Sequence, residues 1–167
     1  IQIAKARGLR TINLTRRSDV ADHLQALGAD VVVSDVTELA ETIREATGNA
    51  PPLLALDAVG GDVMAELIAA LGYGGTLVSY GALSRQPSPI PPGAAIFRDL
   101  RIRGFWLAKW YETAGQEAIR TAFGFLLPLL ASGQLLACRL AKGFGKCCSV
   151  RSVFPLAPPP DLLRGIG

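Results

Sequence analysis

The sequence predicts an α/β fold with a doubly wound parallel sheet, and the stretch from Pro51 to Leu83 supports this best. Two apolar runs, residues 53–56 and 76–80, flank a helical pattern with large apolar side chains on one face. Both runs lack the polar alternation of a half-exposed strand, which is typical of parallel strands covered on two faces. Each run ends in small residues, DAVGG and YGA. Ligands of open parallel sheets bind beyond such carboxyl ends, so these turns are candidate ligand contacts as well as ordinary turn residues.

The residues before this unit repeat the same alternation. The opening residues have the pattern of a helix that ends at Gly8, and strands are predicted at 10–15 and 30–35. A helix is predicted after each strand, and Ser18 or Asp19 is a candidate N-cap for the first of them. Strands and helices therefore alternate four times, which favours one sheet with right-handed crossovers.

The pattern changes after the central unit. Residues 84–93 contain four of the eleven prolines and predict an extended loop, after which a strand is expected at 101–106. A helix is predicted at 113–132, with a kink or an early end at Pro128. The side chains expected to face inward from it are Ile119, Ala122, Phe123, Leu126, Leu127 and Leu130. Residues 138–167 show little periodicity, so we predict an ordered domain at 1–137 and an irregular tail at 138–167.

Composition excludes several classes of protein. The net charge of +3, from 17 basic and 14 acidic side chains, is too small to favour a nucleic-acid partner. The longest strongly apolar run, residues 123–130, is too short to span a membrane, and no secretion signal opens the sequence. The three cysteines, Cys138, Cys147 and Cys148, lack the spacing of a metal site or a disulfide framework, so we expect no bound metal and a reducing compartment.

Arg16 and Arg17, followed by Ser18, come directly after the predicted strand at 10–15. At this place a dinucleotide-binding fold recognises the adenosine ribose, and arginine there accommodates a 2′-phosphate. The guanidinium group matches phosphate geometry with two donors in a fixed fork. The alternative is that both arginines are simply solvated, as most loop arginines are.

Other candidate residues each have two interpretations. Asp57 ends a strand, where it can contact a ribose or cap the following turn. Tyr80 can donate a proton or stack on a ring. His23, the only histidine, is expected to lie on the surface, because no Ser–His–acid spacing accompanies it. Three aromatic side chains can belong to the core or form the wall of a nicotinamide pocket: Phe105, Trp106 and Trp110.

Four motifs in this order resemble the medium-chain dehydrogenase/reductase superfamily: TINLTRRSD, LALDAVGG, GGTLVSYGAL and FRDLRIRGFWLAKW. They are most similar to the NADPH-dependent trans-2-enoyl-CoA/ACP (2-enoyl thioester) reductases. The resemblance covers roughly residues 1 to 137, and DLRIRGFWL is its most specific part.

The resemblance implies a Rossmann-like cofactor domain and an oxidoreductase that reduces the C=C bond of enoyl-CoA or enoyl-ACP in fatty acid synthesis. It also implies a homodimer, through the edge strand near 101–106. The catalytic tyrosine of the family belongs to another domain, so no catalytic residue is assigned here. The implied NADPH-binding positions are Arg16, Arg17, Ser18, Tyr80, Gly81, Ala82, Leu83, Phe105, Trp106, Leu107 and Ala108.

The sequence departs from the family at both ends. The first strand and its glycine-rich pyrophosphate loop would precede Ile1, and the similarity fades after Leu136. We therefore expect a fragment that is inactive alone, with a frameshift near Cys138. Alternatives are a quinone oxidoreductase of the same superfamily and a non-catalytic Rossmann-like fragment. The expected location is the cytoplasm for a bacterial parent and the mitochondrial matrix for a eukaryotic one.

Overall fold

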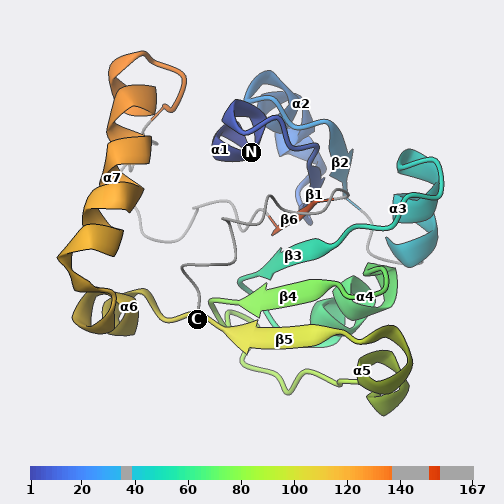
Figure 1. The fold of residues 1–167 in the computed structure, drawn as a ribbon. Coiled ribbons are helices and arrows are strands. Elements are labelled where there is room, and N and C mark those ends of the chain that lie inside the picture. Colours follow the sequence, from blue (N-terminus) through green and yellow to red (C-terminus); the bar gives the residue numbers. More distant parts are fainter. Residues whose placement is uncertain (35–38, 137–150, 155–167) are drawn as a thin grey trace.

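The computed structural model describes residues 1–34, 39–136 and 151–154, and these residues form a sheet with helices beside both faces (Figure 1). The strand order is β2-β1-β6-β3-β4-β5. The strands are β1 (Ile12–Leu14), β2 (Val31–Val33), β3 (Leu54–Asp57), β4 (Thr76–Ser79), β5 (Arg101–Gly104) and β6 (Arg151–Phe154). The first five run in the same direction, whereas β6 is antiparallel to both of its neighbours. The predicted α/β class with a doubly wound parallel sheet is confirmed.

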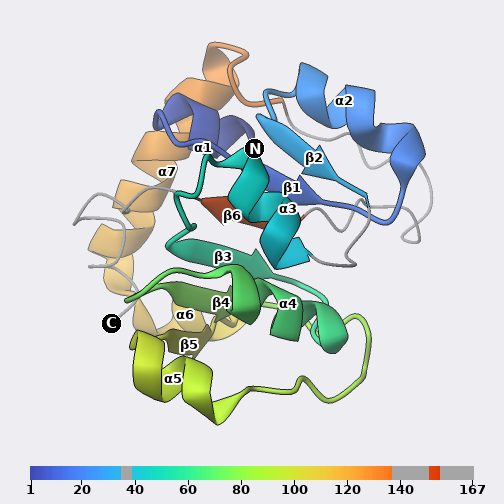
Figure 2. The same ribbon diagram turned by 90° about the vertical axis from the view of Figure 1, so that its right-hand side faces the viewer.

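Helices connect the strands in the expected alternation. They are α1 (Gln2–Ala6), α2 (Ala21–Ala26), α3 (Leu39–Ala46), α4 (Asp62–Ala70), α5 (Pro92–Arg98), α6 (Leu107–Thr113) and α7 (Gly115–Ala131), with a 3-10 turn, η1 (Ser18–Val20), before α2. Figure 2 shows α3 and α4 in front of the strands and α7 behind them. Helices α3 and α4 cover one face of the sheet, and Ala4 of α1 packs against Leu54 and Val78 on the other face.

The core follows the two-residue period of the strands. Ala55 and Leu77 have no exposed surface and belong to the main cluster of buried residues, together with Ile43 of α3 and Leu67 of α4. The adjacent strand residues, Leu54 in β3 and Val78 in β4, belong to a second cluster with Ala4 of α1. This alternation confirms that β3 and β4 are buried on both faces.

The helix predicted at 113–132 differs from the structure in three ways. The helix itself is confirmed as α7, but it begins at Gly115, because a separate short helix that was not predicted, α6, ends at Thr113. Helix α7 continues past Pro128 to Ala131, which excludes the early end, one of the two alternatives predicted there. The third difference concerns burial, since no side chain of α7 is fully buried. Of the side chains predicted to face inward, Ile119, Ala122 and Leu126 are half-buried, whereas Phe123, Leu127 and Leu130 are exposed.

Helix α5 is an element that the sequence analysis did not predict. It begins at Pro92, inside the stretch expected to be a loop. Proline suits this position, because the N–H groups of the first helical turn have no acceptor within the helix and proline lacks an N–H. Ala94 is buried in the main core cluster. The Arg98 guanidinium donates hydrogen bonds to the carbonyls of Ile68 (3.1 Å), Ala69 (3.0 Å) and Leu71 (2.9 Å) at the end of α4.

Strand β6 comes from the tail for which no regular structure was predicted. It lies between β1 and β3, with Asn13 and Leu56 both in register with Ser152. In doubly wound dinucleotide folds the strand order is 3-2-1-4-5-6, counted along a complete domain. In that order β1 and β3 of this chain occupy the places of strands 2 and 4, and the place between them belongs to strand 1. Here the last described strand takes that place in the opposite direction, and the other tail residues lie outside the described residues.

Candidate cofactor-binding edge

The candidate site is the edge of the sheet where the parallel strands end. Because β1, β3, β4 and β5 run in the same direction, the segments that follow them emerge at this one edge. Those segments contain all the NADPH-binding positions predicted from the sequence. How each segment is held decides which part of the edge is rigid and which is adaptable.

The turn after β3 is held by a buried carboxylate. Asp57 has no exposed surface, its Oδ1 accepts a hydrogen bond from the Val59 N–H (3.0 Å), and its Oδ2 accepts one from the Gly60 N–H (2.8 Å). Of the two roles considered for Asp57, the structure shows turn capping. The Gly61 N–H donates to the Ser88 hydroxyl (2.8 Å), which ties this turn to the proline-rich loop.

The segment after β4 is bonded to the turn after β3. The Tyr80 N–H donates to the Asp57 carbonyl (2.9 Å), and the Leu83 N–H donates to the Ala58 carbonyl (3.3 Å). A Cβ atom on Gly81 would lie 2.6 Å from the same Ala58 oxygen, so this close approach requires glycine. The two turns therefore form one hydrogen-bonded unit, from which the side chains of Tyr80, Ala82 and Leu83 extend outward and are exposed.

The segment after β5 continues this unit. The Phe105 N–H donates to the Ser79 carbonyl (2.8 Å), and the Phe105 ring packs against the second core cluster. The next three residues, Trp106, Leu107 and Ala108, are exposed as α6 begins. Of the two interpretations offered for the aromatic residues, Phe105 is partly core, whereas Trp106 is 72% exposed at the candidate edge.

The loop after β1 is built differently. Arg16, Arg17 and Ser18 are all exposed. The Arg17 guanidinium forms a two-point ion pair with Asp19, with Nε to Oδ1 at 3.1 Å and Nη2 to Oδ2 at 2.6 Å. The hydrogen bond from Arg17 lowers the pKa of the Asp19 carboxyl below its usual value. Neither Ser18 nor Asp19 caps the helix with its side chain, so that expectation is wrong.

The structure brings together some of the predicted positions and separates others. Segments 80–83 and 105–108 follow adjacent strands and are joined by backbone bonds. The arginine loop lies on the other side of β6, two strand positions away from β3. His23 is exposed, as expected for a surface histidine. The sequence analysis missed the pairing of Arg17 with Asp19, although a carboxylate two residues after an arginine was a usable signal.

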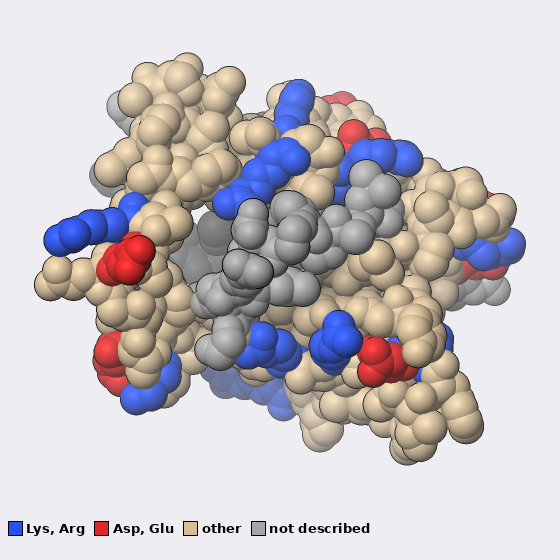
Figure 3. Space-filling model, in the orientation of Figure 1, with Lys and Arg blue, Asp and Glu red and all other residues tan. Residues whose placement is uncertain are grey.

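Three further observations concern surface charge, membrane-spanning helices and groups of metal ligands. On the face that Figure 3 displays, Lys and Arg side chains occur at several separate places, and some of them lie beside Asp or Glu. In the part of the chain that the structure describes, no helix is long and apolar enough to cross a membrane. Within the same residues, no three His, Cys, Asp or Glu side chains are grouped so that they could hold a metal ion.

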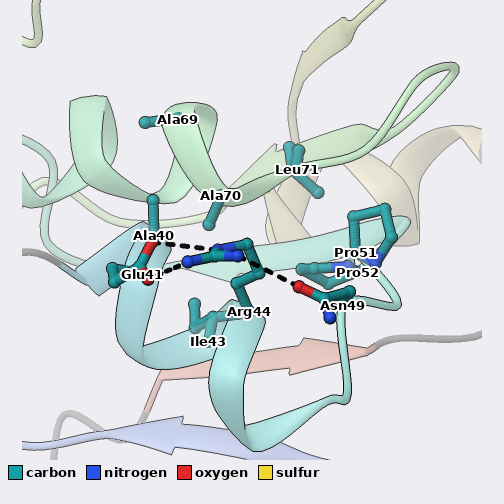
Figure 4. A pocket seen from close by; sticks show the side chains of 10 residues that line it. All are labelled: Ala40, Glu41, Ile43, Arg44, Asn49, Pro51, Pro52, Ala69, Ala70 and Leu71. Carbon is teal, nitrogen blue, oxygen red and sulfur yellow. Dashed lines mark hydrogen bonds and ion pairs between the residues drawn. The ribbon is translucent and has the colours of Figure 1, made fainter.

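A pocket of about 280 Å³ lies at the opposite edge of the sheet, between α3 and α4 (Figure 4). Pro51 and Pro52, which precede β3, form one side of it. Arg44 is held there by Glu41 of the same helix and by the Asn49 side-chain oxygen (3.2 Å). Because ligands of open parallel sheets bind beyond the carboxyl ends of strands, we do not take this pocket as the cofactor site.

Comparison with known proteins identifies the family. The zinc-binding dehydrogenase family matches residues 1–125. The mitochondrial enoyl-[acyl-carrier-protein] reductase of Dictyostelium discoideum is 41% identical over 139 residues, which cover 80% of this chain and 40% of that protein. The corresponding human enzyme is 39% identical over 142 residues, which cover 82% of this chain and 38% of that protein.

Solved structures agree with this assignment. A mutant of Etr1p in complex with NADP and crotonyl-CoA superposes with a TM-score of 0.73 at 26% identity, covering 83% of this chain and 40% of that one. A protein from Mesorhizobium loti described as an NADPH:quinone reductase gives a TM-score of 0.68 at 28% identity, covering 81% of this chain and 40% of that one.

The shared region is a minor part of each relative. The chain spans 40% of the length of the Dictyostelium relative and 38% of the human one. The match nevertheless includes every parallel strand and the whole candidate edge, because β5 and the segment after it lie within residues 1–125. By its sequence and its fold, the chain belongs to the zinc-binding dehydrogenase family.

Proposed function

We propose that the chain is the cofactor-binding part of an NADPH-dependent oxidoreductase that reduces the C=C bond of 2-enoyl thioesters. The observation that carries the proposal is the exposed pair Arg16 and Arg17 directly after β1, where a phosphorylated ribose is recognised in dinucleotide folds. The relatives named enoyl-[acyl-carrier-protein] reductase, and the neighbour that holds NADP and crotonyl-CoA, support the same activity.

The described residues fit the two ends of such a cofactor. Arg16, Arg17 and the Ser18 hydroxyl offer hydrogen-bond donors for a 2′-phosphate, and the charge and fork geometry of guanidinium suit a dianion. At the other end, segments 80–83 and 105–108 supply a rigid backbone and exposed side chains to orient a nicotinamide ring. Bound NADPH supplies a hydride for the β-carbon of the substrate. We assign no catalytic residue to this chain.

The name of the family implies zinc, and the described residues do not fit it. They hold no group of three or more His, Cys, Asp or Glu side chains that could ligate a metal ion. We therefore derive no step that depends on zinc. Hydride transfer to an activated double bond relies on the position of the cofactor, which the hydrogen-bonded turns after β3 and β4 are suited to maintain.

Assembly and location are part of the proposal. Strand β5 is an outer strand of the described sheet, paired with β4 on one side only, and Arg101, Arg103 and Gly104 are exposed. Such an edge can pair with the same strand of a second copy, so we propose a homodimer through 101–106. By analogy with the mitochondrial relatives, we propose the mitochondrial matrix for a eukaryotic parent and the cytoplasm for a bacterial one.

The first experiment tests the phosphate site on the chain itself. Calorimetric titration with 2′,5′-ADP and with 5′-AMP isolates the contribution of the 2′-phosphate. Arg17→Ala and Arg16→Ala should each weaken 2′,5′-ADP binding by about tenfold, because each removes a charged donor. Arg10→Ala is the matched control, since Arg10 is an exposed arginine at the other end of β1. Equal affinity for both nucleotides would refute the arginine assignment and favour a non-catalytic fragment.

The second experiment tests the reaction. The chain replaces the matching 139 residues of the Dictyostelium relative, and NADPH oxidation is followed with crotonyl-CoA and with a quinone. Faster turnover of crotonyl-CoA supports the proposal. Preference for the quinone would support the alternative that the Mesorhizobium loti neighbour suggests, and preference for NADH over NADPH would count against the arginine pair as the selectivity element.

A further inference from the structure

The two arginines of the loop after β1 differ in the partners of their guanidinium groups. Both oxygens of the Asp19 carboxylate engage the guanidinium of Arg17, from Nε and Nη2. Among the described residues, none forms a hydrogen bond or ion pair with the Arg16 side chain. Both members of the Arg17–Asp19 pair are well exposed, with side-chain exposures of 49% and 65%, so a ligand arriving from solvent can reach them.

A carboxylate and a phosphate compete for the same guanidinium. Both present two oxygens to two parallel N–H donors, and the Nε–Nη2 edge of Arg17, which Asp19 occupies, can hold only one such group at a time. A 2′-phosphate that binds Arg17 must therefore displace Asp19 or bind beside it. In the second case two anions would lie close together, which raises the free energy of the bound state.

We propose that Asp19 is a selectivity-tuning residue that holds the Arg17 guanidinium as an internal substitute for phosphate and thereby weakens binding of the phosphorylated ribose. This inference rests on the proposed function. Asp19 acts through Arg17 and is a positioning residue. Arg16 then makes the first contact with the phosphate, and Arg17 joins after it leaves Asp19.

Removing the charge of Asp19 should strengthen binding. Exposed ion pairs contribute little, so Asp19→Asn is expected to tighten 2′,5′-ADP binding by about two- to fivefold. Binding of 5′-AMP should stay unchanged, because that nucleotide has no 2′-phosphate to compete. The measured quantity is the ratio of the affinities for 2′,5′-ADP and 5′-AMP, since a purely structural effect of the substitution would change both affinities by the same factor. Asp19→Glu restores a carboxylate and should return the ratio toward the wild-type value.

Asp22→Asn is the matched control. Asp22 lies three residues further along, in the first turn of α2, is exposed, and forms no ion pair with the described residues, so its removal makes the same change in net charge. We expect it to leave the affinity ratio at the wild-type value. Circular dichroism of all three variants verifies that the fold is intact.

The outcomes separate the two proposals. If the wild-type chain binds 2′,5′-ADP no better than 5′-AMP, the proposed phosphate site is wrong and the role of Asp19 is refuted with it. If the wild-type chain discriminates and Asp19→Asn leaves the ratio unchanged or lowers it, only the role of Asp19 is refuted. A lowered affinity for 5′-AMP in Asp19→Asn would instead show that Asp19 contacts the ribose, as an acid does in unphosphorylated dinucleotide sites.

Discussion

The turns after β3 and β4 are held by a fully buried carboxylate and by hydrogen bonds to each other, whereas the loop after β1 combines an exposed ion pair with one hydrogen bond from the Arg17 N–H to the Thr15 hydroxyl. In the first region the Asp57 carboxylate has no exposed surface, and each turn donates to or accepts from the other. In the second region the Arg17–Asp19 pair lies in solvent. The difference places a hydrogen-bonded pair of turns and an exposed, charged loop along the same edge of the sheet.

Within the described sheet, the strands of the two regions are joined by hydrogen bonds only through β6, although both regions contribute to the main core cluster. Ending the chain after Leu136 removes β6 and leaves β1 and β3 without their common partner. Because unpaired buried backbone groups are costly, we expect a lower midpoint of thermal unfolding. A chain that ends after Phe154 is the control, and it should have the higher midpoint. Identical melting of the two truncated chains would show that β6 contributes nothing.

The second prediction compares the loss of stability on truncating a side chain of α4, which packs against β3 and β4, with the loss on truncating one of α7. Leu67→Ala should lower the free energy of unfolding by about 2–5 kcal/mol, because Leu67 has no exposed surface and its removal leaves a cavity. Leu127→Ala on α7 should change it by less than about 0.5 kcal/mol, since Leu127 is 56% exposed. Urea denaturation of both variants measures the difference. A large loss at Leu127 would indicate that something covers α7 in solution, such as a second copy.

The third prediction tests the close approach between the rigid turns. Gly81→Ala should cost about 1–3 kcal/mol, because the new Cβ would lie 2.6 Å from the Ala58 backbone oxygen, which cannot move cheaply. Gly104→Ala, also at the candidate edge, has no atom within 4 Å of the added Cβ and should be close to neutral. Denaturation midpoints of the two variants provide the comparison, and equal midpoints would contradict a tightly packed turn.

The smallest effect is expected from an exposed ion pair outside both regions. The hydrogen bond from Arg44 lowers the pKa of the Glu41 carboxyl below its usual value. A lowered folded-state pKa stabilises the fold above pH 4.5, and this contribution is lost as the pH falls through the folded-state value. Glu41→Gln should therefore be slightly less stable than wild type at neutral pH and equally stable in acid. Glu66→Gln serves as the control, and a stability difference that persists in acid would argue against the ion pair.

The repeating parts of the fold were predictable because local patterns determine them. The apolar runs at 53–56 and 76–80 and the helix between them correspond closely to β3, β4 and α4. Strand β6 was not predicted, since it is placed by partners on both sides rather than by a pattern of its own. Helix α7 has the expected spacing of apolar residues, but periodicity cannot show what covers a helix.

The candidate site was predictable in position and less so in detail. The order of strands places Arg16 and Tyr80 at one edge, which follows from the alternation of strands and helices. The contacts of Asp57 and Asp19 depend on side-chain geometry, and the sequence pattern also allowed another role for each, a ribose contact for Asp57 and a helix N-cap for Asp19. NADPH binding by the named positions stays a prediction until the nucleotide titrations are made.

The contact of Arg98 with the end of α4 gives α5 an unusual attachment. One end of this short helix is held by a cation on three carbonyl groups, and its other end is held by Ala94 in the core. Raising the ionic strength weakens the first attachment in part, since two of its three hydrogen bonds are partly buried, and leaves the second intact. In concentrated salt, α5 should therefore fray from its C-terminal end first. The helical order of α5 then depends on the salt concentration, whereas the order of the sheet does not.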